Sequence, residues 1–168
     1  MKITGCFMAL AVICSAVLLN AQDTDASSAG KVLFVYDKVD KGTKLYVEAY
    51  RENLKATGLP VEEAAVESTA VTDISPFGTI ILYSRVMAFD KKSPVRDWLK
   101  KQKDLTGKSV FLFVTANKWM NDKNFQSIME IVKGLKGNVV DAVSMATAKM
   151  SESQKRDAVA KHLEKLTK

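Results

Sequence analysis

The stretch Val32-Leu33-Phe34-Val35-Tyr36 decides how this sequence folds. A continuous apolar run of strand-forming residues is typical of a strand that is covered on both of its faces. The stretch Ser109-Val110-Phe111-Leu112-Phe113-Val114 is as strongly hydrophobic and indicates a second strand of this kind. Such strands occur in parallel sheets that lie between layers of helices. We therefore expect an α/β fold.

Helical patterns alternate with further short strands along the rest of the chain. The expected strands are 32–36, 61–66, 79–83, 109–114 and 138–143, and the expected helices cover 43–56, the segment that opens at Ser93-Pro94, the segment around 125–132 and the segment that begins at Ser151. Glu62 and Glu63 favour an edge position for the second strand. The connection over 67–78 is too short for more than a helical turn. Alternation of this kind indicates parallel crossover units.

The length and composition describe one globular domain. The chain has 168 residues, of which 47% are hydrophobic and 26% are charged, and its formal net charge is +6. This apolar content is enough for a core and excludes disordered and collagen-like chains. Both cysteines, Cys6 and Cys14, lie near the start, and His162 is the one histidine. For the remainder of the chain we therefore exclude disulfides, zinc–cysteine sites, iron–sulfur clusters and multi-histidine metal centres.

The first residues have the layout of a secretory signal peptide. Lys2 precedes an apolar run from Cys6 to Leu19, and the chain turns polar around Ala21. The run falls short of the ~20 apolar residues that a membrane-spanning helix needs. We expect residues 1–21 to be a signal peptide cleaved after Ala21, residues 22–30 a flexible leader and residues 31–168 the folded domain. The protein would then be periplasmic or secreted, with an uncleaved anchor as the alternative.

Three loops follow strands at the edge where ligands bind in an open parallel sheet. They cover 37–42, 84–92 and 115–122. The first loop leads into a helix N-terminus, whose free amides and dipole attract anions. The acidic residues show no pair at a catalytic spacing, and His162 stands at the edge of the inward face of the last helix. From the sequence we therefore name no catalytic residue and no metal ligand.

The segments 32–43, 79–99 and 110–115 resemble the flavodoxin-like family most strongly, and the resemblance extends over 31–166. In that family the first loop is rich in hydroxyls and holds the phosphate of flavin mononucleotide (FMN), and Thr43 matches the last threonine of that loop. The resemblance implies a three-layer fold in which helices cover both faces of a five-stranded parallel sheet of order 2-1-3-4-5. It also implies FMN, or another small planar ligand, and electron transfer, either as a carrier or in a quinone-type reductase.

The resemblance assigns candidate FMN contacts to all three loops. They are Lys38, Lys41, Gly42 and Thr43 in the first loop, Ser84, Arg85, Val86 and Phe89 in the second, and Asn117 and Trp119 in the third. Phe89 and Trp119 would stack on the two faces of the flavin ring, or would alternatively cover the end of the sheet. Asp37 and Asp40 depart from the family pattern, because a carboxylate repels phosphate unless it points away or is protonated. The alternative for this loop is a solvated turn in which an Asp caps the helix.

Charge divides the chain into two unequal parts. Residues 22–90 carry a net negative charge and residues 91–168 a strongly positive one, with lysines clustered over 91–103. Such a basic surface suits an acidic redox partner protein or the anionic surface of the cell envelope. Its aromatic residues do not interleave with the lysines, so we expect no nucleic-acid binding. We therefore expect an exported FMN-binding electron carrier or quinone-type reductase, and the alternative is a cofactor-free flavodoxin-like binding module at the cell envelope.

Overall fold

The computed structural model of this chain describes residues 30–66, 71, 73–86, 93–117 and 122–167. Strands and helices alternate through these residues, as the sequence predicts. In chain order they are β1 (Val32–Tyr36), α1 (Lys44–Thr57), β2 (Val61–Ala65), β3 (Thr79–Val86), α2 (Pro94–Leu99), β4 (Ser109–Ala116), α3 (Asp122–Gly134), β5 (Asn138–Ala146) and α4 (Glu152–Leu163).

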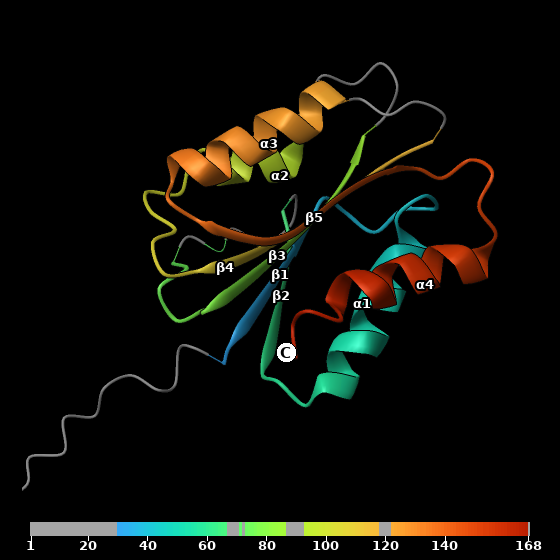
Figure 1. Cartoon of the computed structure of the whole chain (residues 1–168), viewed down its shortest axis with the longest axis horizontal. Coiled ribbons are helices and arrows are strands. Elements are labelled where there is room, and N and C mark those ends of the chain that lie inside the picture. Colours follow the sequence, from blue (N-terminus) through green and yellow to red (C-terminus); the bar gives the residue numbers. More distant parts are fainter. Residues whose placement is uncertain (1–29, 67–70, 72, 87–92, 118–121, 168) are drawn as a thin grey trace, which may run out of the picture.

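The strands form one parallel sheet in the order β2-β1-β3-β4-β5. Helices α1 and α4 cover one face of the sheet, and α2 and α3 cover the other (Figure 1). The prediction of a three-layer α/β fold with strand order 2-1-3-4-5 is confirmed. β2, which contains Glu62 and Glu63, lies at an edge, where both carboxylate side chains reach solvent.

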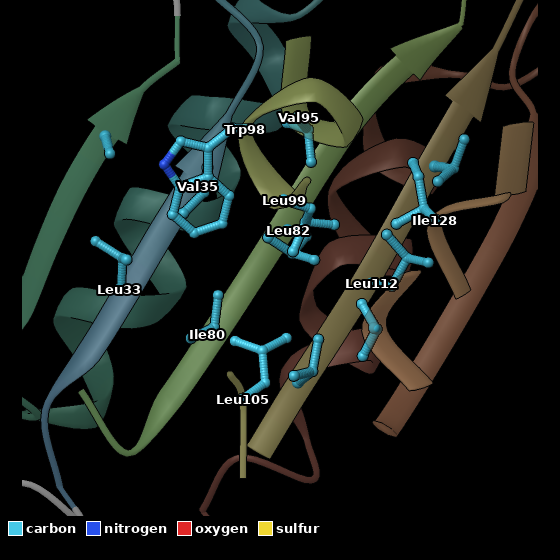
Figure 2. Packing of buried hydrophobic residues seen from close by; sticks show 14 of the residues in the cluster. Leu33, Val35, Ile80, Leu82, Val95, Trp98, Leu99, Leu105, Leu112 and Ile128 are labelled. Atoms are coloured by element: carbon cyan, nitrogen blue, oxygen red, sulfur yellow. The ribbon is translucent and has the colours of Figure 1, made fainter. Parts of the chain in front are cut away.

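Alternate residues of the strands build two apolar cores, one on each face of the sheet. On one face, Val35 and Leu82 pack with Trp98 of α2 and Ile128 of α3 (Figure 2). On the other face, the strands pack against α1 and α4, and this core is rich in aromatic rings. All five residues of β1 are buried. Full burial of a large apolar side chain stabilises the fold by about 1.5–3 kcal/mol. Because residues 32–36 are apolar on both faces of the strand, a central position that buries all of them is favoured.

Serine side chains cap the N-termini of two helices, at the predicted positions. The Ser93 hydroxyl accepts a hydrogen bond from the Arg96 amide at the start of α2. At the start of α4, Ser151 and Gln154 bond to each other's backbone amides and form a capping box. These bonds satisfy amides that a helix leaves without partners in its first turn.

The later strands extend further than the sequence predicts. β3 continues to Val86, so Ser84, Arg85 and Val86 lie in the strand and the predicted loop 84–92 was placed too early. The reason is pairing at long range: all three residues stand in register with β4. β4 and β5 are extended likewise, to Ala116 and Ala146.

Some predictions concern residues that lie wholly or partly outside the described ranges. The predicted signal peptide and nearly all of the leader lie outside the described residues, as does part of the connection 67–78. No helix is found in the described part of that connection, where Ile74 and Phe77 are buried. Across the described part of the chain, no helix has the length and apolar character needed to cross a membrane.

His162 is part of the packing between α4 and the sheet. Its side chain is buried, meets Phe111 and Phe113 at ring-centroid distances of 5.6 and 5.2 Å, and places Nδ1 2.8 Å from Asp141 Oδ2 on β5. Burial lowers the pKa of His162, although the Asp141 carboxylate acts in the opposite direction. The ring is therefore neutral and donates a hydrogen bond from Nδ1 to Asp141. This bond helps to hold α4 on the sheet.

The protein should lose stability as the pH falls below 6.5, the ordinary pKa of histidine. Below that value the unfolded chain takes up a proton at His162 more readily than the folded chain does, which favours unfolding. His162→Phe keeps a ring in the core and removes the titrating group, so its urea midpoint should change less between about pH 8 and about pH 5.5. Equal pH dependence in both proteins would show that His162 does not control this loss.

Candidate functional site

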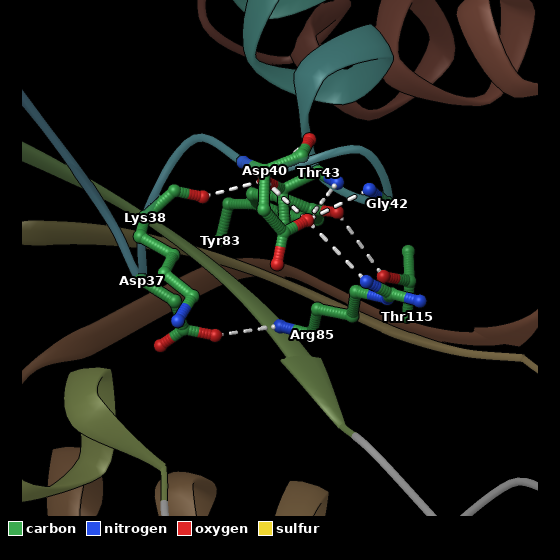
Figure 3. Close-up of polar contacts among 8 residues, drawn as sticks. All are labelled: Asp37, Lys38, Asp40, Gly42, Thr43, Tyr83, Arg85 and Thr115. Atoms are coloured by element: carbon green, nitrogen blue, oxygen red, sulfur yellow. Dashed lines mark hydrogen bonds and ion pairs between the residues drawn. The ribbon is translucent and has the colours of Figure 1, made fainter.

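The loop between β1 and α1 is closed by one of its own carboxylates. Asp40 Oδ1 accepts hydrogen bonds from the backbone amides of Gly42 at 2.7 Å and Thr43 at 3.0 Å. The Thr43 hydroxyl accepts from the Asp40 amide at 2.8 Å and donates to the Lys38 carbonyl (Figure 3). Burial raises the pKa of Asp40, but the two amides and Arg85 outweigh it, so the pKa lies below its usual value. Asp40 thus closes the turn that precedes α1, whereas Thr43 at the helix start makes no side-chain cap bond, so the turn of the alternative is present without an Asp at the cap position.

Arg85 reaches across from β3 to this loop. Its Nη1 lies 3.4 Å from Asp40 Oδ1, and its side chain is 27% exposed. The guanidinium also packs directly on Gly42, where the Cβ of any other residue would stand 1.7 Å from Nη1. Glycine at this position therefore permits the close approach of the cation that balances Asp40.

Asp37 joins three elements at the carboxyl edge of the sheet. One carboxylate oxygen accepts from the Ser84 hydroxyl at 3.0 Å and the Arg85 amide at 2.8 Å, and the other accepts from the Val95 amide at 3.1 Å. The side chain is buried. Asp37 thus holds the end of β1 to β3 and to the first turn of α2, and it points away from the loop amides.

A cavity of about 250 Å³ opens between the starts of α1 and α4. The residues that line it come from the first loop and α1, from the ends of β3 and β4, from the segment after β5 and from α4. They are Lys41, Gly42, Leu45, Tyr46, Arg85, Thr115, Asn117, Thr147, Ala148, Glu152 and Lys155. Most carry polar groups that donate hydrogen bonds or positive charge, which suits a polar anionic ligand better than a flat apolar ring.

Tyr46 borders this cavity from α1. Its side chain is 3% exposed, and its buried hydroxyl lies beside the Thr147 side chain. Burial raises the pKa of Tyr46, while the nearby Thr147 side chain and the Arg85 charge lower it. Because Thr147 and Arg85 both line the cavity, the hydroxyl end of Tyr46 lies beside it.

The first loop, as folded, does not fit an FMN phosphate. The amides of Gly42 and Thr43 already bond to Asp40, and the carboxylate would face the phosphate at close range. Two anions in contact without a bridging cation are strongly unfavourable, and Arg85 is the one cation paired with Asp40 among the described residues. No cluster of three His, Cys, Asp or Glu side chains occurs in the described ranges.

The predicted FMN contacts fall into separate groups. Lys41, Gly42, Arg85 and Asn117 meet around the cavity, whereas Thr43, Ser84 and Val86 are buried within the fold and Lys38 is exposed on the loop. Phe89 and Trp119 lie outside the described residues, so their stacking role stays a prediction. The candidate contacts missed Tyr46 on α1, Thr115 on β4, Thr147 after β5 and Lys155 on α4, which the packing of these distant elements brings to the cavity.

Asp37→Asn should lower the free energy of unfolding by about 1–3 kcal/mol, the cost of a buried donor without a partner. Whichever way the amide turns, its NH₂ group faces a backbone N–H that the carboxylate accepted. The matched control is Asp73→Asn, at an exposed position, which should change stability by less than about 0.5 kcal/mol. Urea unfolding of both variants checks the difference, and equal effects would contradict a bridging role for Asp37.

Comparison with known proteins shows which solved structures have a similar fold. No protein-family model and no curated protein sequence matches the chain. Among solved structures, oxidised Flavodoxin 2 from Bacillus cereus matches with a TM-score of 0.61 and 19% identity, over 79% of this chain and 96% of that one. A flavodoxin from the domain Archaea matches with a TM-score of 0.59 and 14% identity, over 82% of this chain and 99% of that one.

A larger protein contains the same fold as one part. The flavodiiron protein from Giardia intestinalis matches with a TM-score of 0.60 and 17% identity, over 83% of this chain and 36% of that one. This chain therefore spans only about a third of that protein. Together with the strand order and the helices on both faces of the sheet, these matches show that the chain has the flavodoxin-like fold.

Proposed function

We propose that this protein is a flavodoxin-like binding module that works without FMN. The observation that carries the proposal is the Asp40 carboxylate, which accepts the Gly42 and Thr43 amides. These are amides of the loop to which the family resemblance assigns the flavin phosphate. A phosphate would have to expel Asp40, break its contact with Arg85 and return a partly buried carboxylate to solvent before gaining any bond. The loop therefore favours its own carboxylate.

A second candidate is an FMN-binding electron carrier or quinone-type reductase. Its support is the match to flavodoxins over nearly their whole length, together with Lys41 and Arg85 close to the loop. In this candidate Asp40 turns out of the loop, Arg85 transfers from Asp40 to the phosphate, and Thr43 offers its hydroxyl. Bound FMN would supply one- or two-electron transfer.

We further propose that the module acts outside the cytoplasm, in the periplasm or after secretion. The support is the basic, apolar and small-residue order of residues 1–21. The excess of lysine and arginine after residue 90 suits an acidic protein partner or anionic envelope lipid.

Visible absorption and a fluorescence titration with FMN separate the two candidates. The purified protein should be colourless and should not quench high-micromolar FMN. Asp40→Gly, which removes the competing carboxylate, should quench FMN more strongly than the unaltered protein. Riboflavin, which lacks the phosphate, serves as the matched ligand and should show no such gain.

A flavin spectrum in the purified protein would overturn the cofactor-free proposal. So would tight FMN binding that Asp40→Gly does not improve, because the carboxylate would then not be what excludes the phosphate. Either result favours the electron carrier.

A further inference from the structure

We propose that a cavity at the amino edge of the sheet, on the face that α2 and α3 cover, docks an acidic peptide segment of a partner protein. The inference rests on the proposed function and deepens it, because it names the docking surface and the kind of partner of the binding module. The cavity lies between the segment before β3 and the connection from α2 to β4. The loop that Asp40 closes lies at the opposite, carboxyl edge of the sheet (Figure 1).

Hydrogen bonds to main-chain carbonyls fix the walls of this cavity. The Leu105 amide donates to the Leu135 carbonyl at 2.7 Å, and the Asn138 amide donates to the Lys108 carbonyl at 3.0 Å. The Lys108 ammonium donates to the Phe77 carbonyl at 2.7 Å, which ties the segment before β3 to the same edge. The cavity measures about 640 Å³, within the roughly 300–1,000 Å³ typical of ligand clefts. Walls that are fixed in advance lower the entropy cost of binding.

The charge that stays unpaired at this edge is positive. Lys101 and Lys103 line the cavity and are exposed. Hydrogen bonds from Thr106 lower the pKa of Asp104, and the charge of Lys136 lowers it further, which places Lys136 beside the cavity as well. None of these three lysines forms an ion pair among the described residues. Their charges attract an acidic segment and orient it over the cavity.

The backbone of Lys136 is a separate observation that favours a role for its charge. Its φ is 62°, in the left-handed region, and among the described residues Lys136 is the one non-glycine residue with a positive φ. Glycine is common in this conformation just after a helix, because a Cβ is disfavoured there. A lysine at this position makes the turn after α3 less stable than a glycine would. Such a cost is typical of residues that serve binding rather than folding.

The acceptor oxygens around the cavity favour a peptide over a phosphate or a membrane surface. Asp73 Oδ1 accepts from the Ser75 amide at 2.9 Å, and Asp104 Oδ1 accepts from the Thr106 amide at 3.0 Å. No hydrogen bond among the described residues ends on either Oδ2 atom, so both can accept backbone N–H groups of a peptide. A phosphate has no N–H to offer and would meet two carboxylates. Val39, the one large apolar side chain exposed in the described ranges, lies at the opposite edge, too far away to anchor this one in a bilayer.

Fluorescence anisotropy of a labelled oligoglutamate peptide tests the proposal, with oligoglutamine of the same length as the matched ligand. The purified protein should bind the glutamate peptide and not the glutamine peptide. The cavity variant, Lys101→Gln with Lys103→Gln and Lys136→Gln, should weaken binding at least tenfold. The matched control variant loses the same charge at exposed positions that do not line the cavity, by glutamine substitution of Lys55, Lys123 and Lys149.

Lys136→Gly separates the charge of this residue from its effect on the fold. Glycine relieves the disfavoured backbone conformation, so the thermal midpoint should rise, while the lost charge should weaken peptide binding several-fold. A higher midpoint with unchanged peptide binding would overturn the assignment of Lys136 to the docking surface.

The remaining outcomes test the surface and the proposed function separately. Equal weakening in the cavity and control variants would overturn the inference, since the peptide would then bind by general charge alone. Binding to phosphatidylglycerol vesicles without binding to the peptide would overturn it too, because the partner would then be a lipid surface. No binding of the peptide and no binding of FMN overturns the docking surface and leaves the cofactor-free proposal standing. FMN binding, together with peptide binding that the cavity variant weakens, supports the docking surface and overturns the cofactor-free proposal.

Discussion

The Asp37 carboxylate is the interaction on which the carboxyl edge of the sheet depends. It lies where β1, β3 and α2 meet and accepts one side-chain and two backbone hydrogen bonds from Ser84, Arg85 and Val95. A buried carboxylate that is fully hydrogen-bonded fixes its neighbours, because any shift leaves charge or donors unpaired. The position of Arg85 follows from this bond, and the pairing of Arg85 with Asp40 follows from its position.

The Asp40 carboxylate closes the loop between β1 and α1, next to the sheet edge that Asp37 holds together. The fold offers amides before α1 that attract an anion, and here the chain provides the anion itself through Asp40. Arg85 balances the charge, and Gly42 leaves room for the guanidinium. A shared fold does not imply a shared ligand, and the difference here rests on side chains within one loop.

The elements of this fold were predictable where local pattern and burial agree. The apolar run 32–36, the edge strand with Glu62 and Glu63, and the helix starts at Ser93 and Ser151 all carry signals within a few residues. The end of β3 was not predictable, because Ser84 and Arg85 are polar and stay in the strand through pairing with β4 and the bond to Asp37. Such contacts join residues thirty or more positions apart in the chain.

The candidate site was predictable only in part. An Asp near a helix start is a recognisable cap, and the alternative of a capped turn followed from it. The choice between cap and phosphate cradle depends on Arg85, which is 45 residues from Asp40. Tyr46 falls outside the pattern of Val47, Tyr50 and Leu54, and its place in the cavity lining is known only once the segment after β5 is placed beside it.

The most direct test of the account is an NMR titration that follows the backbone amide shifts of Gly42 and Thr43 with pH. If Asp40 holds these amides, both shifts should follow a single carboxyl titration with a midpoint below 3.8, the ordinary value for an aspartate. Amides that do not respond, or that respond with a midpoint at or above that value, would contradict a loop closed by its own carboxylate.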